Sequence, residues 1–423
     1  MITGTIDRTA REAIASACGD VRDAEQSDHV DGVAPGLVAR PADTAQVAEV
    51  LRAAAAHDLS VVPRGRSTKM SWGTPPSSAD VLLDVSALDQ VLDHAAGDLI
   101  VATQAGARLS DVQEVVGQGG QRLALDETVP GASIGGTLAA NTSGPRRVAT
   151  GTARDLLIGI TVVRADGVVA KAGGRVVKNV AGYDLCKLMI GSAGTLGVIT
   201  DATFRLHPVP SAHSWVSVPV GDPAHAQQAV QSVVHSQAVP AAVEIEWADG
   251  RGSVSVLLEG RDEGVAGRAA TVRKLLGQAS TESVEAPAGG STYPWDLSAA
   301  GDRRPTALKL TFVLSCLADV LAEAGLADGR GTGVSLRGSA GSGVVYAAID
   351  PGATPEDVST TVGRLRSTCT RHSGSVVVVD APPDVKAAVD VWGPIPALDL
   401  MRRVKDQFDP DHRLAPGRFV GGI

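Results

Sequence analysis

Two glycine-rich loops constrain this chain more than any other feature of its sequence. The first, Pro63 to Lys69, directly follows a short apolar stretch, and the second, Pro130 to Gly144, contains the pair Gly135-Gly136. Glycine lets a backbone turn sharply and approach a ligand closely. Successive backbone N–H groups at such a turn form a concavity that binds anions. The loops therefore predict two backbone cradles for a ligand that carries a diphosphate.

The residues around these loops add donors and exclude two common folds. Arg64, Arg66, Ser67 and Thr68 supply side-chain donors, and small residues after Gly136 open a short helix whose N-terminus favours anions. Neither loop has the glycine spacing of the Rossmann dinucleotide fingerprint or of the P-loop. Both of those folds are therefore excluded.

Composition limits the remaining classes of protein. The 423 residues are 44% apolar but only 3% aromatic, which predicts roughly two to three domains with aliphatic cores. A net charge of −9 argues against a nucleic-acid ligand. The four cysteines lie far apart, so neither a disulfide framework nor an iron–sulfur cluster is expected. We find no signal peptide and no apolar run that would span a membrane, and we expect a cytoplasmic protein.

Hydrophobic periodicity divides the chain. Asp166-Gly167 predicts a tight hairpin, and Pro208 to Pro210 predicts a domain boundary. From residue 212 the order β-α-β-β-α occurs twice around a linker at 278–292, which is typical of two ferredoxin-like units on one antiparallel sheet. The expected segments are 1–29 (a helical lead-in), 30–211 (ligand binding), 212–395 (a cap) and 396–423 (a C-terminal helix and tail).

Three motifs in order resemble a known family. They are Pro63 to Lys69, Pro130 to Gly144 and Lys178 to Ile199, and together they are similar to the FAD-binding domain of the vanillyl-alcohol oxidase and p-cresol methylhydroxylase (PCMH) family over about residues 30–211. The resemblance implies an α+β fold: a two-subdomain PCMH-type FAD-binding domain, then a cap domain of two ferredoxin-like α/β units on one antiparallel sheet. A C-terminal segment would return to the flavin domain. The tail, Phe408 to Arg418, is similar to the 2-hydroxy-acid dehydrogenase branch.

The same resemblance implies FAD as the cofactor. Relatives with covalent flavin carry a histidine in the first loop or a cysteine in the second, and this chain has neither there, so we expect non-covalent FAD. The residues expected to bind FAD are Pro63, Arg64, Gly65, Arg66, Ser67, Thr68, Lys69, Pro130, Gly131, Ser133, Ile134, Gly135, Gly136, Ala140, Asn141, Gly144, Arg154, Asp155, Gly197, Val198 and Ile199.

Over nearly its whole length the chain is similar to the smaller FAD-binding subunits of bacterial glycolate oxidases. This implies oxidation of a small 2-hydroxy acid, glycolate or lactate, by hydride transfer to flavin N5. A second flavin subunit and an iron–sulfur subunit are the implied partners. Electrons would pass to a partner, to a quinone or to oxygen. Any attachment to the inner face of a membrane would be through the partner subunits.

The catalytic groups are less well defined by the sequence. Arg175, Lys178 or Arg337 would bind the substrate carboxylate, and Tyr183 would orient the alcohol. Val177 occupies the place where relatives carry the substrate arginine. The cap lacks the paired histidines of metal-assisted relatives, so no metal is expected.

Three alternatives stay open at this point. The chain would be a non-catalytic electron-relay or structural subunit, an NADPH-dependent flavin reductase, or a phosphate-binding module without flavin. The missing histidines and the displaced arginine favour the first of these.

Overall fold

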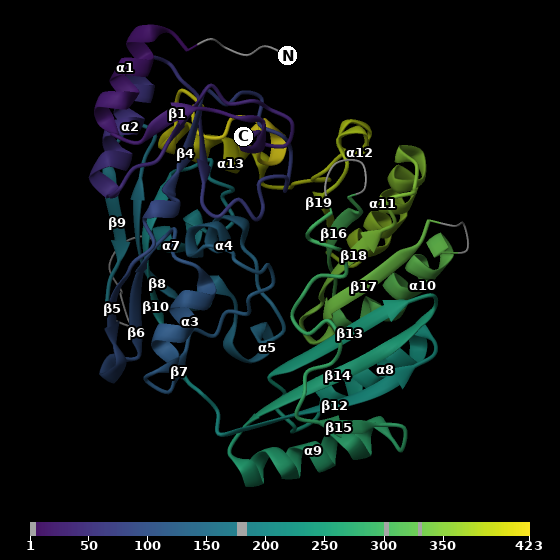
Figure 1. The fold of residues 1–423 in the computed structure, drawn as a ribbon. Helices are drawn as coiled ribbons and strands as arrows, with labels where there is room; N and C mark the ends of the chain where they lie inside the picture. The colour runs from purple at the N-terminus through teal and green to yellow at the C-terminus, as the bar shows by residue number, and fades with distance from the viewer. Residues whose placement is uncertain (1–5, 176–183, 300–303, 329–331) are drawn as a thin grey trace.

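The computed structural model describes residues 6–175, 184–299, 304–328 and 332–423. The described residues form a mixed α+β structure in which the N-terminal half lies beside a large separate sheet (Figure 1). This arrangement has the predicted α+β class and the predicted antiparallel cap sheet.

The first sheet of the N-terminal half has four strands in the order β1-β2-β4-β3, and β2, β4 and β3 run parallel. Strand β4 is buried along its whole length and consists mainly of aliphatic residues, as a parallel strand covered on both faces must be. Helices α1 and α2 pack on it through residues such as Ile14 and Leu51. The element bounds are α1 Arg8–Ala17, β1 Val21–Asp23, β2 Leu37–Ala39, α2 Thr44–Ala56, β3 Val61–Arg64 and β4 Val81–Asp84.

The second sheet has five antiparallel strands in the order β5-β6-β10-β8-β9. Strands β8 and β9 form the hairpin predicted from Asp166-Gly167, and Gly167 has the positive φ, 75°, that this turn requires. Helices α3 and α4 pack on this sheet. The bounds are β5 Val91–Ala95, β6 Ile100–Gln104, α3 Leu109–Gly117, α4 Ile134–Ala140, β8 Leu157–Val163, β9 Val169–Gly173, α7 Leu185–Met189 and β10 Val198–Arg205. The short strands β7, Gln121–Arg122, and β11, His207–Pro208, pair with each other.

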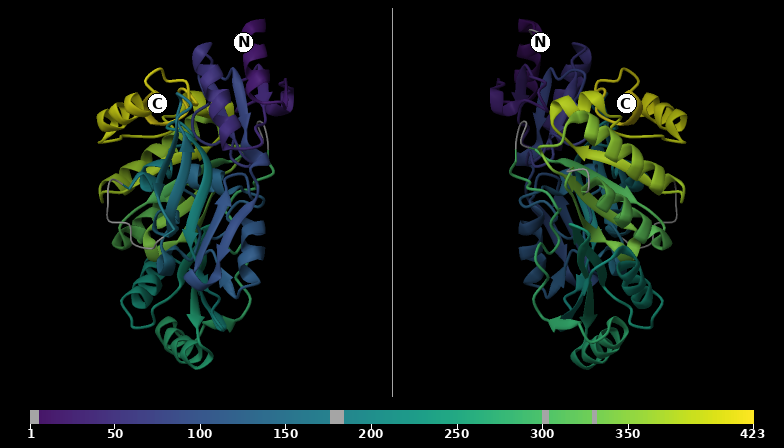
Figure 2. Two further views of the ribbon diagram at one scale, coloured as in Figure 1. Left: turned by 90° about the vertical axis from the view of Figure 1, so that its left-hand side faces the viewer. Right: turned by 90° about the vertical axis from the view of Figure 1, so that its right-hand side faces the viewer.

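The cap is one eight-stranded antiparallel sheet in the order β15-β12-β14-β13-β17-β18-β16-β19. It contains the repeated β-α-β-β-α order predicted from the sequence, with four helices on one face (Figure 2). The bounds are β12 Ala212–Val220, α8 Pro223–Val234, β13 Ala242–Ala248, β14 Arg251–Gly260, α9 Asp262–Leu276, β15 Thr281–Ser283, β16 Thr306–Thr311, α10 Leu317–Asp328, β17 Val334–Ser339, β18 Val344–Ile349, α11 Pro355–Thr370 and β19 Ser375–Asp380.

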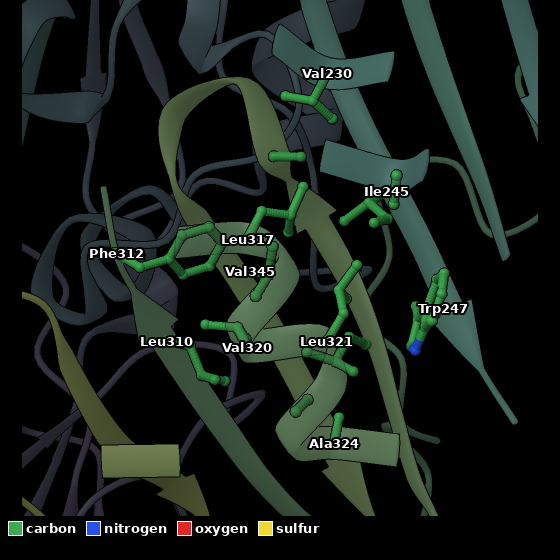
Figure 3. Close-up of a cluster of buried hydrophobic side chains, with 14 of the residues drawn as sticks. Val230, Ile245, Trp247, Leu310, Phe312, Leu317, Val320, Leu321, Ala324 and Val345 are labelled. Carbon is green, nitrogen blue, oxygen red and sulfur yellow. The ribbon is translucent and has the colours of Figure 1, made fainter. Parts of the chain in front are cut away.

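The two faces of the cap sheet differ in polarity. Ile245 and Trp247 of β13 point toward the helices and are buried with Leu310, Leu321 and Val345 (Figure 3). Successive side chains of a strand point to opposite faces. The residues that alternate with Ile245 and Trp247, such as Glu244, therefore lie on the face turned toward the N-terminal half.

Some local predictions were wrong. Residues 278–292 are not simply a linker, because β15 pairs with β12 there and extends the sheet. Among the described residues of the lead-in, α1 is followed by strand β1 and by a single 3₁₀ turn at Gln26–Asp28. Two single-turn helices, α5 (Arg147–Thr150) and α6 (Ala153–Leu156), follow α4. The division of the chain at 29, 211 and 395 stays a prediction.

The C-terminal segment returns to the N-terminal half, as predicted. After α12 (Pro383–Ala388), helix α13 (Leu398–Phe408) contributes Lys405, which is fully buried and pairs with Asp409 at 2.6 Å. The Lys405 ammonium also donates to the carbonyl of Thr195 at 2.8 Å, and Ala415 N donates to Val61 O at 2.8 Å. These contacts attach the tail to strand β3 and to the loop before β10.

A buried charged cluster joins the cap to the N-terminal half. Lys386 pairs with Asp31 at 2.6 Å and with Asp380 at 3.1 Å, and Arg304 bridges the same two carboxylates. Ser71, in the segment after the first glycine loop, donates to Asp380 at 2.7 Å. The edge strand β19 is therefore tied directly to the chain that leaves that loop.

Candidate flavin site

A cavity of about 330 Å³ lies between the N-terminal half and the cap sheet. Its walls come from both glycine loops, from the loop at 191–199, from cap strands β16, β18 and β19, and from the C-terminal tail. Cavities of this size, with mainly apolar walls and a few polar groups, are typical of cofactor sites.

The first loop presents free backbone donors to this cavity. The N–H groups of Arg66, Ser67 and Thr68 donate no hydrogen bond to any residue that the structure describes. Ser67 has a φ of 60°, which turns the backbone sharply at this point. Three successive unpaired N–H groups at a cavity wall form an anion cradle of the kind that the sequence predicts.

The arginine side chains of this loop are engaged elsewhere. Arg64 donates to Asp28 and to Asp84, each at 2.7 Å, and its guanidinium is largely buried. Arg66 donates to Gly106 O at 3.0 Å. These two side chains therefore fix the loop on strand β4 and its neighbours, and the expected diphosphate donors are the backbone groups instead.

The second loop packs against the first. A Cβ atom at Gly65 would lie 2.3 Å from Ser133 Oγ, so only glycine allows this contact. Ser133 caps helix α4 by accepting from Gly136 N at 3.2 Å. Ile134 N and Gly135 N donate to backbone carbonyls of residues 107 and 105. The first N–H groups of α4 are thus used within the protein, contrary to the expectation that they would hold an anion.

Most of the residues predicted to bind FAD line the cavity. They are Pro63, Arg64, Gly65, Arg66, Ser67, Thr68, Lys69, Ser133, Gly135, Gly136, Ala140, Asn141, Gly197, Val198 and Ile199. Six others are not among the lining residues: Pro130, Gly131, Ile134, Gly144, Arg154 and Asp155. Asp155 instead caps α6 by accepting from Thr152 N at 2.8 Å.

The predicted catalytic residues lie away from the cavity or outside the described residues. Tyr183 and Lys178 fall within 176–183, which the structure does not describe. Arg175 is exposed, and it pairs with Asp93 at 2.9 Å. Arg337 donates to Tyr293 O at 3.2 Å and pairs with Glu246. Of the predicted cations that the structure describes, neither Arg175 nor Arg337 lines the cavity.

The cap strands bring a cation, Lys309, and a phenol, Tyr346, to the cavity. The sequence predicted neither as a site residue. Lys309 of β16 lies directly opposite Tyr346 of β18 in antiparallel register, and both side chains line the cavity. The Lys309 ammonium forms no hydrogen bond or ion pair with any described residue. Burial, with a smaller effect of the positive Arg147, lowers the pKa of Lys309 to about 8.

Two further cations reach the cavity from the other side. Burial lowers the pKa of Lys69 to about 8, and its ammonium lies 5.9 Å from the centre of the Trp72 ring. Arg418 of the tail donates to Met70 O at 2.6 Å, and burial lowers its pKa to about 10. The cavity is therefore positive, and its described lining contains no aspartate, glutamate, histidine or cysteine.

Aromatic side chains gather at the cap end of the cavity. Tyr293 stacks on Trp295 with ring centres 4.5 Å apart, and it meets Tyr346 and Trp72 edge to face at 4.6 and 5.7 Å. Tyr293 and Tyr346 are two of only three tyrosines in the chain. Such rings exclude water from this end of the cavity. The Tyr293 hydroxyl accepts a hydrogen bond from Thr128 Oγ1 at 3.0 Å.

Behind these two tyrosines lies a second, much smaller hollow of about 20 Å³, which we call the polar recess. It is lined by Arg147, Glu244, Ser339, Tyr293 and Tyr346 among others. Arg147 Nη1, Glu244 Oε1 and Ser339 Oγ are buried without a hydrogen-bond partner among the described residues. Burial, and secondarily the nearby Asp126, raises the pKa of Glu244 to about 8.

The residues present fit FAD. The unpaired N–H groups at 66–68 suit a diphosphate, and the apolar walls, such as Val198 and Val378, suit a flat ring system. The Lys309 ammonium, which has no partner among the described residues, suits an anionic or hydrogen-bond-accepting group of a ligand. When bound, FAD supplies a two-electron oxidant that accepts hydride.

Comparison with protein families agrees with this geometry. Residues 35–173 match the FAD binding domain, and residues 394–419 match the C-terminal domain of FAD linked oxidases. The chain therefore contains an FAD-binding domain of the PCMH type, joined to an FAD-oxidase C-terminal segment.

Several named proteins resemble it in sequence. The chain is 31% identical over 211 residues to glycolate oxidase subunit GlcD of Bacillus subtilis, covering 50% of this chain and 45% of that one. It is 37% identical over 184 residues to a mitochondrial D-lactate dehydrogenase [cytochrome] of Arabidopsis thaliana, covering 44% and 32%. Each match therefore spans less than half of the relative.

Solved structures resemble the chain over almost its whole length. An alkyldihydroxyacetonephosphate synthase superposes with a TM-score of 0.73 at 15% identity, covering 99% of this chain and 87% of that one. A BBE-like protein of Physcomitrella patens gives 0.70 at 15% identity, covering 96% and 97%. At these identities the likeness shows the fold.

Within the described residues, no helix is long and apolar enough to cross a bilayer.

Proposed function

We propose that this chain is an FAD-dependent oxidoreductase that oxidises a small 2-hydroxy acid, glycolate or lactate. The observation that carries the proposal is the unpaired Lys309 ammonium beside the Tyr346 ring, at the cap end of a cavity with FAD-binding loops at its other end. A buried cation without a protein partner is costly and needs an anionic ligand. The carboxylate of a 2-hydroxy acid is such a ligand.

The surrounding residues suit this substrate class. The aromatic cluster of Trp72, Tyr293, Trp295 and Tyr346 forms the cap end of the cavity, beside the position proposed for the substrate. The Tyr346 hydroxyl is a natural hydrogen-bonding partner for the alcohol, because burial raises its pKa and keeps the phenol protonated. In this assignment Lys309 holds the carboxylate and Tyr346 orients the alcohol.

The relatives support the same class of substrate. Their names include glycolate oxidase, D-lactate dehydrogenase and D-2-hydroxyglutarate dehydrogenase. All three names describe oxidation of a carbon that carries a hydroxyl next to a carboxylate. By analogy, a second flavin subunit and an iron–sulfur subunit would accept the electrons.

A non-catalytic electron-relay subunit is the second candidate. It is favoured by the cavity lining, which offers no carboxylate or histidine as a direct base among the described residues. Anaerobic addition of glycolate and of each lactate enantiomer to the isolated FAD-loaded chain separates the two candidates. Bleaching of the visible flavin absorption supports the enzyme, whereas full FAD content with no bleaching supports the relay.

A further inference from the structure

The oxidation of an alcohol to a carbonyl compound releases one proton in addition to the hydride, and a nearby group must accept it. The main cavity has no carboxylate or histidine in its described lining. The buried carboxylate next to it is Glu244, in the polar recess on the far side of Tyr346. Tyr346 lines both the cavity and the recess, so it lies between the cavity and Glu244.

The register of the cap sheet places these groups together. Glu244 of β13 lies opposite Ser339 of β17, and Ser339 lies opposite Val344 of β18, two residues before Tyr346. Side chains two apart on a strand share a face. Glu244, Ser339 and Tyr346 therefore all point from the cap sheet toward the N-terminal half, where Arg147 of α5 closes the recess.

The recess has the size and polarity of a water site. About 20 Å³ is enough for one water molecule and too little for a substrate. Buried polar groups normally have partners. Glu244 faces the Ser339 hydroxyl, yet Arg147 Nη1, Glu244 Oε1 and Ser339 Oγ make no hydrogen bond of normal geometry with any described residue. One water in the recess would satisfy several of them at once.

We propose that Tyr346, a water in the polar recess and Glu244 form a proton relay that accepts the proton of the substrate hydroxyl. This inference rests on the proposed function. As the O–H bond of the alcohol breaks, its proton moves to the Tyr346 oxygen, the phenolic proton moves to the water, and a proton of the water moves to ionised Glu244. FAD, held by the two glycine-rich loops, would be the two-electron oxidant that takes the hydrogen on carbon with its electron pair, so that a neutral 2-hydroxyl becomes a 2-oxo group.

The charges around Glu244 fit this role. The groups that face it are Asp126, which favours its protonation, Arg147, which opposes it, and the hydroxyls of Ser339 and Tyr346. With a pKa of about 8, Glu244 changes charge within the neutral to mildly alkaline range and can take up and release protons during turnover. Tyr346 touches the substrate in this account, and Glu244 acts through it.

Two variants with a matched control test the relay. Glu244→Gln removes the proton acceptor and keeps the shape, and Tyr346→Phe removes the hydroxyl that joins the cavity to the recess. Glu246→Gln is the control, since Glu246 is on the same strand and face but pairs with Arg337. FAD content and circular dichroism establish that each variant is folded.

The first readout is independent of turnover. Infrared titration of the FAD-loaded protein should show a buried carboxylic-acid band that disappears with a midpoint near pH 8, present in wild type and Glu246→Gln and absent in Glu244→Gln. If wild type and Glu244→Gln give the same titration, the relay is wrong, whatever the substrate.

The second readout is the rate of flavin reduction by glycolate or lactate in anaerobic stopped flow. We expect the rate to rise through pH 8 in wild type, and to fall by about 10²-fold and lose this midpoint in Glu244→Gln. Reduction at the wild-type rate and pH profile in that variant would overturn the relay and leave the proposed function intact. Failure of every 2-hydroxy acid to reduce wild type, with the infrared band present, would instead contradict the proposed function.

Discussion

Lys309 on β16 and Tyr346 on β18 are direct cross-strand neighbours, and their side chains leave the cap sheet on the face that meets the two glycine-rich loops. The residues on either side of Lys309, Leu308 and Leu310, point to the opposite face and are fully buried in the core of the cap. The alternation of the strand thus holds one cation rigidly at the cavity. A site on strands is positioned more accurately than one on loops.

Replacing Lys309 with Met should weaken binding of a carboxylate ligand. Loss of a charge-assisted hydrogen bond costs about 1.5–3 kcal/mol, or roughly 10- to 100-fold in Kd. Oxalate, which is not oxidised, is a suitable probe, and its Kd can be followed by perturbation of the flavin spectrum. Lys274→Met on the exposed face of α9 is the control. Unchanged oxalate binding in Lys309→Met would show that another cation holds the carboxylate.

Carboxylate binding should depend on pH through the same residue. Burial lowers the pKa of Lys309 to about 8, so its positive charge is complete well below pH 8 and is lost as the pH rises through that value. Oxalate should therefore bind more weakly above pH 8. The nearby Lys69 has a pKa of about 8 for the same reason, so the comparison with Lys309→Met assigns the effect. A dependence that persists in this variant would point to Lys69.

Gly65→Ala should lower FAD content. The added Cβ would lie 2.3 Å from Ser133 Oγ and would push apart the two loops that line the cavity. Overpacking of this kind typically costs about 1–3 kcal/mol. Gly264→Ala on helix α9 is the control, because a Cβ there meets nothing within 4 Å. The FAD-to-protein absorbance ratio of the purified variants measures the effect, and equal ratios would refute the contact as a determinant of binding.

FAD should be released when the protein is denatured. No cysteine or histidine is present among the described residues that line the cavity, and these are common points of covalent attachment. Acid precipitation should leave the flavin in the supernatant, with the absorption spectrum of free FAD. Flavin that stays in the washed pellet would mean that a covalent bond exists.

Lys405→Met should destabilise the C-terminal attachment. The Lys405–Asp409 pair is fully buried, so removing the cation leaves an unpaired carboxylate, which costs about 3–5 kcal/mol. The double variant Lys405→Met with Asp409→Leu should recover part of this loss, since no buried charge remains. Chemical denaturation followed by circular dichroism gives the free energy of unfolding of each variant. If the effects of the two single substitutions simply add in the double variant, the two side chains are not coupled.

Much of the fold could be predicted because its local signals are strong. The Asp166-Gly167 turn and the repeated β-α-β-β-α order of the cap depend on short-range patterns, and both are present in the structure. Strands β1 and β15 were missed because each has only three residues and carries charged side chains. They exist through pairing with partners distant in sequence, which periodicity does not reveal.

The candidate site was likewise predictable only where its signal is local in the sequence. The loops at 63–69 and 130–144 are marked by their glycines, whereas Lys309, Tyr346 and Glu244 are polar residues flanked by apolar ones in their strands. A charge between two buried aliphatic residues, as in Leu308-Lys309-Leu310, is a weak signal of an inward-facing cation. Only the cross-strand register of the cap sheet shows that these three side chains share a face.

The most direct test is a crystal structure of the FAD-loaded chain with oxalate. We predict the diphosphate at the backbone N–H groups of residues 66–68, the flavin ring in the cavity between loops and cap, and an oxalate carboxylate on Lys309. A diphosphate held elsewhere, or an oxalate that leaves Lys309 unpaired, would contradict the account.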